Sequence, residues 1–395
     1  MENSLSSSKS NNLIVSTFLN KMKTKVLLIA TYAGCPRTWK MAKTLAKAGC
    51  DVHILEWDRD LQLQPLEWVD EVLAHRFRVK AHYGWKLIYK LPLWYFYITI
   101  FCLVKRFDII QPQNLDNLIP IWLIRRIKNF RIVYDIADFY ADAYVPTNAN
   151  LLRKLTRYLE ALLVMRVNAT IIADEARIKQ IGFKPKNLYV IYNSPPDVYG
   201  ILLSRLCTAV NKNSHFTIFY GGAIDDGRGL YHLVEVCQRI SDVTLMIAGF
   251  GRLEKHFLNF IKAKKNVIFL GRISYQEVLN RTMKCDCVVV LYDPRIPNMV
   301  YASPNKLFEA MMCGKPVVVS AGTAMASTVW REKCGLVVNY GDVNELKRAI
   351  ELLKNNPNLA LSLGKNGRKA YLEKYNWQTM EKRLLQVYDS IVKQT

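Results

Sequence analysis

The amino-acid sequence predicts an α/β protein built from two Rossmann-like domains in succession. Its 395 residues are enough for two domains of ordinary size. Short apolar runs typical of buried strands alternate with stretches of helical periodicity, which is the pattern of parallel sheets covered by helices. This alternation weakens near residue 200 and begins again at His215. Two successive units of the same fold class are therefore expected.

The N-terminal half begins its regular structure with a buried strand. Residues 25–31 form a nearly continuous apolar run, as expected for a strand covered on both faces. A short loop leads to a helix that ends near Ala48, because Gly49 is a favourable residue after a helix C-terminus. The remaining predicted elements of this half are strands at residues 52–55, 108–111, 131–135, 170–173 and 188–192, and a helix at 151–167.

The C-terminal half repeats this order around Gly-rich turns. Its predicted strands lie at residues 215–220, 243–248, 267–270, 287–292, 316–320 and 335–338, and its predicted helices at 230–240, 305–312 and 377–392. In the last helix, Trp377, Met380, Leu384, Tyr388 and Ile391 recur at helical spacing, so one face of it is expected to be buried.

Domain boundaries follow from these patterns. Residues 1–21 are polar and rich in Ser and Asn, which predicts a disordered extension without a secretory signal. We expect an N-terminal domain at residues 22–200, a linker at 201–214, a C-terminal domain at 215–376 and a final crossover helix at 377–395.

Composition and charge exclude several classes of protein. Hydrophobic residues make up 51% of the chain and charged residues 22%, a balance typical of globular proteins and not of disordered ones. The net charge of +22 is shared by both halves, so the surface should attract phosphate-bearing molecules, anionic lipid or nucleic acid. The nine cysteines form no CxxC pair and no cluster with metal-ligand spacing, so we expect no metal site.

One apolar run raises the question of a membrane. The run Leu91–Val104 is too short to span a bilayer, which takes about 20 residues. Its aromatic residues and the flanking Lys90, Lys105 and Arg106 suit a helix lying in a membrane interface. Packing of the same helix on the N-terminal sheet is the alternative, and the sequence leaves both open.

Glycines and cations gather where the strands of the C-terminal half end. Because the carboxyl ends of parallel strands share one edge of a sheet, ligands bind there. The turns hold Gly221, Gly222, Gly249, Gly251 and Gly271, whose backbone amides can approach phosphates. Arg228 and Lys306 add cationic partners for a diphosphate. Glu309, expected at the start of a helix, could accept both hydroxyls of a ribose.

These residues and several longer motifs resemble one family. The segments GGAIDDGRGL, IAGFGRLEKHF, VIFLGRISYQEVL and SPNKLFEAMMCGKPVVVS are similar, in order and spacing, to the donor-binding domain of family-four glycosyltransferases. In the N-terminal half, VYDIADFYADAY and VIYNSPPD also resemble this family. The resemblance implies a retaining enzyme of the GT-B fold, in which two Rossmann-like domains face a cleft and the C-terminal helix crosses back to the N-terminal domain.

The resemblance also implies roles for residues. Arg228, Lys306 and Glu309 would be catalytic, and acceptor binding would fall to Gly34, Arg37, Asp135 and Asp138. The donor would be bound by Gly221, Gly222, Gly249, Gly251, Gly271, Arg272, Tyr301, Ser303 and Asn305.

The resemblance implies substrates and a location as well. A nucleotide-diphosphate sugar would be the co-substrate, no further cofactor or metal is expected, and the acceptor would be a glycan or a lipid-linked molecule. We expect a cytoplasmic protein that binds no nucleic acid, with a peripheral position at the inner, anionic face of the cell membrane as the alternative that Leu91–Val104 leaves open.

Two positions depart from the family's pattern. Tyr301 stands where the family often has a glutamate, and Ala137 where it often has a histidine. These departures keep open a non-catalytic homologue that binds a nucleotide or a partner, and a sugar-nucleotide epimerase is a further alternative. Asp58 and Asp60 form a DxD triplet, which we interpret as loop polarity because it lies far from the donor turns in the sequence.

Overall fold

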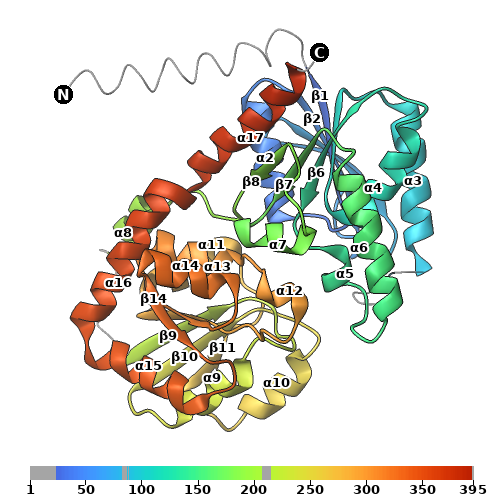
Figure 1. Cartoon of the computed structure of the whole chain (residues 1–395). Helices are drawn as coiled ribbons and strands as arrows, with labels where there is room; N and C mark the ends of the chain where they lie inside the picture. Colours follow the sequence, from blue (N-terminus) through green and yellow to red (C-terminus); the bar gives the residue numbers. More distant parts are fainter. Residues whose placement is uncertain (1–23, 82–86, 88, 207–214, 394–395) are drawn as a thin grey trace, which may run out of the picture. The chain divides into compact units, whose positions relative to one another are not determined.

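The computed structural model describes residues 24–81, 87, 89–206 and 215–393, which form two compact units (Figure 1). The first unit comprises Met1–Ile191 and Met380–Thr395, and the second comprises Tyr192–Thr379. The expected extension at residues 1–21 and residues 207–214 of the expected linker lie outside the described residues. Residues 201–206 of that linker belong to helix α8 (Tyr199–Leu206).

The second unit begins earlier than the boundary expected at residue 200. The ring of Tyr192 lies 5.5 Å from that of Phe308 and 5.1 Å from that of Tyr375, measured between centroids, so the chain joins the second core directly after the last strand of the first sheet. Aromatic packing of this kind is invisible in a linear pattern of polar and apolar residues.

The first unit is built on an eight-stranded sheet. The strand order is β3-β4-β2-β1-β5-β6-β7-β8, and all neighbours are parallel except the edge pair of β3 and β4. Val26 of β1 is paired with Val52 of β2 on one side and Ile109 of β5 on the other. The strands are β1 (Lys25–Ala30), β2 (Asp51–Asp58), β3 (Leu66–Val69), β4 (Val72–Arg78), β5 (Ile109–Pro112), β6 (Arg131–Ile136), β7 (Ala169–Ile172) and β8 (Leu188–Val190).

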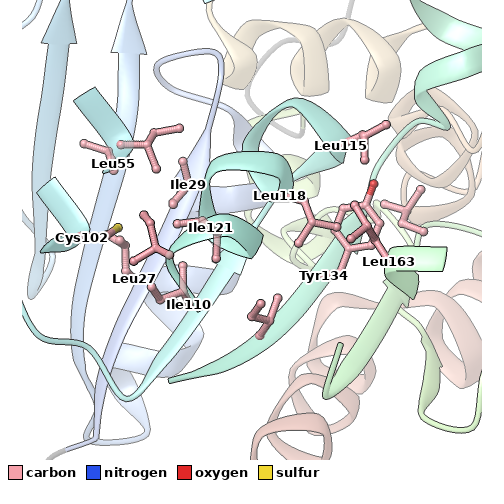
Figure 2. Close-up of a cluster of buried hydrophobic side chains, with 14 of the residues drawn as sticks. Leu27, Ile29, Leu55, Cys102, Ile110, Leu115, Leu118, Ile121, Tyr134 and Leu163 are labelled. Atoms are coloured by element: carbon pink, nitrogen blue, oxygen red, sulfur yellow. The ribbon is translucent and has the colours of Figure 1, made fainter. Parts of the chain in front are cut away.

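The helices of the first unit cover both faces of this sheet. They are α2 (Pro36–Lys47), α3 (Leu91–Val104), α4 (Asn114–Ile124), α5 (Tyr140–Ala143), α6 (Asn150–Val164) and α7 (Ile178–Ile181), and a short 3-10 turn lies at Glu175–Arg177. In the core between sheet and helices, Leu118 of α4, Tyr134 of β6 and Leu163 of α6 lie together (Figure 2).

The second unit is built on a six-stranded sheet in which every pair is parallel. The strand order is β11-β10-β9-β12-β13-β14. The strands are β9 (Phe216–Gly221), β10 (Val243–Ala248), β11 (Val267–Phe269), β12 (Cys287–Val290), β13 (Val317–Ser320) and β14 (Gly335–Val338). The helices are α8, α9 (Leu230–Gln238), α10 (Glu254–Ile261), α11 (Tyr275–Lys284), α12 (Pro297–Val300), α13 (Asn305–Met312), α14 (Ala324–Glu332), α15 (Val343–Asn355) and α16 (Pro357–Ala370).

The last helix, α17 (Trp377–Val392), begins in the second unit and ends in the first. Its predicted apolar stripe is buried throughout. The hydroxyl of Tyr388 donates a hydrogen bond of 2.6 Å to Gln111 Oε1 in β5, and that of Tyr189 in β8 lies 3.0 Å from Ser390 Oγ. The prediction of two parallel α/β sheets with a C-terminal helix returning to the N-terminal unit is thus confirmed.

Helix α3 packs on the first sheet, which is one of the two alternatives that its sequence left open. Leu91, Trp94, Ile98 and Cys102 are buried, and the Trp94 indole donates a hydrogen bond of 2.8 Å to Asn117 Oδ1. Within the described ranges, no helix is both long enough and apolar enough to cross a bilayer.

Candidate functional site

The predicted donor residues gather at the point in the second sheet where the strand order reverses. From β9 the chain proceeds to β10 and β11 on one side, and then to β12 on the other side of β9. Crevices for ligands form at such switch points, outside the carboxyl ends of the strands. Arg228 lies in the loop that follows β9, and Lys306 and Glu309 lie in α13, which follows β12, so the two connections that border the switch point supply all three side chains.

A Gly-Arg-Gly turn presents Arg228. Gly227 and Gly229 have φ angles of 71° and 63°, which side-chain-bearing residues rarely adopt. A Cβ atom at Gly227 would lie 2.5 Å from Ile296 Cδ1, and one at Gly229 would lie 2.5 Å from Leu291 Cβ. Both positions therefore require glycine. Gly227 was not among the residues predicted from the sequence, although two glycines flanking one arginine indicate a tight turn that presents the arginine side chain.

The Arg228 guanidinium lies over an aromatic ring, and not all of its N–H groups have hydrogen-bond partners. Its Cζ is 4.3 Å from the centroid of Tyr292, and it donates a hydrogen bond to the Tyr292 hydroxyl. Its Nε is buried and has no hydrogen-bond partner among the described residues. A cation placed in this way at the head of a helix is unfavourable unless an anion binds beside it.

Lys306 is a buried cation close to Arg228. Its Nζ lies 3.9 Å from the centroid of the Tyr220 ring. Burial and the nearby Arg228 together lower the pKa of Lys306 to about 7, although Glu309 opposes both effects. A Cβ atom at Gly222 would lie 2.5 Å from Nζ, so that glycine makes room for the ammonium group. Two neighbouring cations of this kind form a site that a diphosphate would stabilise.

Glu309 does not lie at a helix start, as the sequence had suggested. Helix α13 begins at Asn305, so Glu309 falls in its second turn, where it is only 4% exposed. The Tyr275 hydroxyl donates a hydrogen bond to it, and burial together with this carboxylate raises the pKa of Tyr275. In this structure Glu309 therefore joins α13 to α11.

Gly249 and Gly251 allow the loop after β10 to pack closely against the loop after β9. A Cβ atom at Gly249 would lie 1.8 Å from the carbonyl oxygen of Gly222, and one at Gly251 would lie 2.2 Å from that of Ile224. The amide of Gly222 donates to Ala248 O at 2.9 Å, and that of Gly249 donates to Gly271 O at 2.8 Å. These two amides already donate hydrogen bonds within the protein, so the structure shows a packing role for both glycines.

The loop between α12 and α13 offers unsatisfied polar atoms. Tyr301 is half-buried and ends α12, directly before the loop that contains Ser303. Ser303 Oγ and Asn305 Oδ1 are buried and have no hydrogen-bond partner among the described residues. Buried polar atoms of this kind are costly unless a ligand or water satisfies them. Together with the free Nε of Arg228, they fit a polar ligand at this sheet edge.

An exposed aromatic–arginine pair lies on the loops of the neighbouring strands. The Arg272 guanidinium carbon is 4.6 Å from the centroid of Phe250, whose side chain is 45% exposed. Gly271, which precedes Arg272, has a φ of 65°.

The structure gives the predicted acceptor residues partners within the protein. Arg37 and Asp135 form a buried salt bridge with a nitrogen–oxygen distance of 2.7 Å, and Arg37 also donates to Ile191 O. The Gly34 amide donates a hydrogen bond of 2.8 Å to the buried Glu56. Because these groups are occupied, the structure explains Gly34, Arg37 and Asp135 without any acceptor.

The other carboxylates of the first unit are engaged in similar ways. Asp138 is paired with Arg177 at 3.0 Å, although a third of its side chain stays exposed. Asp58 accepts hydrogen bonds from the backbone amides of residues 62 and 63 and faces Arg78, which agrees with loop polarity. Across the described ranges, no group of three or more His, Cys, Asp or Glu side chains is arranged to hold a metal ion.

Comparison with known proteins points to one reaction class. Residues 208–370 match the family described as Glycosyl transferases group 1. An uncharacterized glycosyltransferase of Haemophilus influenzae is 25% identical over 338 residues, which cover 83% of this chain and 88% of that protein. An uncharacterized glycosyltransferase of Methanocaldococcus jannaschii is 29% identical over 180 residues, but these cover only 45% of this chain and 48% of that protein.

A third relative has a specific name. The N,N'-diacetylbacillosaminyl-diphospho-undecaprenol alpha-1,3-N-acetylgalactosaminyltransferase of Campylobacter jejuni is 24% identical over 283 residues, which cover 67% of this chain and 71% of that protein.

Solved structures share the fold over almost the whole chain. A sucrose-phosphate synthase from Thermosynechococcus elongatus has a TM-score of 0.78 at 20% identity, with 94% of this chain and all of that chain covered. Anabaena HepE, solved in complex with UDP and glucose, has a TM-score of 0.69 at 16% identity, with 93% and 100% covered.

Proposed function

Since the chain is a retaining group 1 glycosyltransferase of the GT-B fold, we propose that it transfers a hexose from a nucleotide-diphosphate sugar held by its second unit to a glycan or lipid-linked acceptor. The pairing of Arg228 with the buried Lys306 at the switch point carries this proposal. Arg228 and Lys306 lie close enough that Arg228 lowers the pKa of Lys306, so the site concentrates positive charge that an incoming diphosphate would stabilise.

The chemistry of transfer gives these two residues a role. The bond from the anomeric carbon to the diphosphate breaks through an oxocarbenium-like transition state, and negative charge develops on the leaving diphosphate. Arg228 and Lys306 stabilise that charge where it forms. The acceptor hydroxyl attacks from the face on which the diphosphate leaves, and its proton passes to a diphosphate oxygen. No protein nucleophile is needed.

The loop from Tyr301 to Asn305 would contact the transferred sugar. Its unsatisfied Ser303 and Asn305 oxygens suit the hydroxyls of a hexose. The Tyr301 phenol can donate one hydrogen bond and stack on a sugar face, neither of which a carboxylate can do. This difference from the family's usual carboxylate would affect the choice of sugar more than nucleotide affinity.

A lipid-linked acceptor fits the comparison with the Campylobacter jejuni relative, whose name includes a diphospho-undecaprenol. We propose that the chain acts in the synthesis of a cell-surface polysaccharide or glycoconjugate, as a cytoplasmic enzyme at the inner face of the membrane. Its charge of +22 suits that anionic surface.

The decisive experiment measures release of nucleoside diphosphate from a panel of UDP-, GDP- and ADP-hexoses with lipid-linked acceptors. One donor should be turned over selectively. Arg228→Ala should lower kcat/KM for that donor about tenfold to a hundredfold, because charge-assisted hydrogen bonds contribute about 1.5–3 kcal/mol. Arg239→Ala is the matched control, since Arg239 lies on the surface of the same unit and pairs with Glu235, one turn away on α9. Donor binding without release of diphosphate under any of these conditions would favour the non-catalytic homologue.

A further inference from the structure

Helix α6 exposes large apolar side chains to solvent, whereas its acidic residue, Glu160, is buried. Five large apolar side chains recur along it at helical spacing, each between 41% and 72% exposed: Leu151, Leu152, Leu155, Tyr158 and Leu159. An ordinary surface helix shows the opposite arrangement, with its apolar stripe turned to the core. So large a continuous exposed apolar surface marks a site of interaction.

Polar contacts fix the helix in this orientation. The buried Glu160 accepts a hydrogen bond of 2.6 Å from the Tyr134 hydroxyl at the base of the helix. Arg153 and Arg157 both bind Asp142 of α5, the former at 2.8 Å. Among the apolar side chains of α6, Leu163 and Val164 are buried in the core, and Figure 2 shows Leu163 beside Tyr134. The exposed leucines therefore cannot turn inward without breaking these bonds.

The charges that border this face are cationic. Lys154 and Arg166 are exposed beside the leucines, and the one acidic residue of α6, Glu160, is buried. A second copy of this chain would bring like charges together at the same face, which costs free energy. A surface of anionic lipid would instead meet the cations with phosphates and the leucines with acyl chains.

The neighbouring helices also expose apolar side chains. Helix α3 packs on α4, α4 on α5, and α5 on α6 (Figure 1). The face of α3 that points away from the core exposes Leu93, Phe96, Ile100 and Val104. Leu123 near the end of α4 and Arg126 just after that helix are exposed.

We propose that α6 docks the first unit onto an anionic membrane, lying in the plane of the interface with its leucines among the acyl chains. Its 15 residues span about 22 Å, which suits a helix lying along a surface and not one that crosses it. The inference rests on the proposed function, in that docking would bring a lipid-linked acceptor within reach of the enzyme.

Vesicle co-sedimentation tests the docking without any enzymatic step. The full chain should pellet with phosphatidylglycerol-containing vesicles at low salt and stay in solution with pure phosphatidylcholine vesicles. The combined substitution Leu151→Ser, Leu155→Ser and Tyr158→Ser should weaken binding about tenfold or more and leave the melting temperature unchanged, because all three side chains are already exposed.

A matched control uses three leucines of similar exposure in the second unit. Leu352→Ser, Leu361→Ser and Leu372→Ser should leave vesicle binding unchanged. Lys154→Gln with Arg166→Gln should reduce the part of the binding that salt disrupts.

Three results would overturn the docking. They are a wild type that ignores anionic vesicles, a triple α6 variant that binds as tightly as the wild type, and a wild-type dimer that the triple variant converts to monomer. Release of nucleoside diphosphate with a detergent-solubilised acceptor reports on the proposed function separately. Turnover without vesicle binding contradicts only the docking, and vesicle binding without turnover contradicts only the enzyme.

Discussion

Lys306 holds a charge that depends on what lies beside it. With its pKa lowered to about 7 by burial and by Arg228, the amine is largely neutral above pH 7 in the empty site. A bound diphosphate favours the ammonium form, so binding should draw a proton from solution. We therefore expect donor affinity to fall as pH rises from 7 to 9, by up to about tenfold per unit.

Calorimetry of nucleoside diphosphate binding in two buffers of different ionisation enthalpy measures this proton uptake. Lys306→Gln should bind more weakly and lose the pH dependence. An affinity that stays constant between pH 7 and pH 9 in the wild type would show that the lysine keeps its proton throughout.

Glu309 can be tested for a role beyond joining two helices. Glu309→Gln keeps an acceptor for the Tyr275 hydroxyl and should preserve the melting temperature, whereas Glu309→Ala leaves that hydroxyl without its partner. If Glu309 holds the donor ribose, Glu309→Ala raises the dissociation constant of the nucleotide, and Tyr275→Phe, which removes only the helix contact, does not. Equal nucleotide affinity in all three variants would leave Glu309 a purely structural residue.

At the scale of elements, the first sheet contains a pair of histidines that should make it sensitive to acid. His53 Nδ1 of β2 lies 2.9 Å from His75 Nε2 of β4. Burial, together with the nearby Lys105, lowers the pKa of both histidines, that of His75 to about 4, while Asp51 opposes the shift of His53.

The two histidines take up protons less readily in the folded state than in the unfolded state. Their contribution to the free energy of unfolding is therefore complete above pH 6.5, and it is lost as the pH falls toward 4. We expect a loss on the order of 1–3 kcal/mol in unfolding free energy over that range. Urea unfolding at pH 7 and pH 5 measures it. His75→Gln should reduce the difference, and His256→Gln, an exposed histidine of the second unit, should not. A wild type equally stable at both pH values would exclude the effect.

The sequence predicted the elements whose pattern is local. Continuous apolar runs identified the buried parallel strands, such as β1, since burial on both faces leaves no polar position. The sequence did not predict the antiparallel edge strands β3 and β4. In β3, the apolar Leu66 and Trp68 are exposed, and β4 contains the charged Arg76 and Arg78. The sequence predicted a helix at 151–167 but not which side of it faces the core, which the hydrogen bond between Glu160 and Tyr134 shows.

The sequence predicted those parts of the candidate site that follow from a local pattern. The order of Gly-rich turns along the chain places Arg228 and Lys306 at one sheet edge, and the structure does so. Whether a polar side chain faces a ligand or another part of the protein depends on contacts between distant residues. The salt bridge between Arg37 and Asp135 joins positions 98 residues apart, and nothing in the local sequence reveals it.

At the scale of the whole molecule, we expect transfer to proceed without a divalent metal. Arg228 and Lys306 can supply the positive charge that a metal ion would bring to the diphosphate. Turnover should therefore stay within about twofold of its initial value after treatment with EDTA. Activity that disappears on chelation and returns with Mn²⁺ would contradict this expectation and require ligands outside those described.

The division of the first unit between the two ends of the chain has a consequence for biosynthesis. Its core includes Leu384, Val387 and Tyr388 of α17, all fully buried, and these residues are translated only after the whole second unit. The unit that a ribosome begins first is thus the last to be completed. Until α17 has been translated, the surface of the first unit that contacts it, including Gln111 of β5 and Tyr189 of β8, stays uncovered, and in that interval a nascent chain would depend on chaperones to cover it.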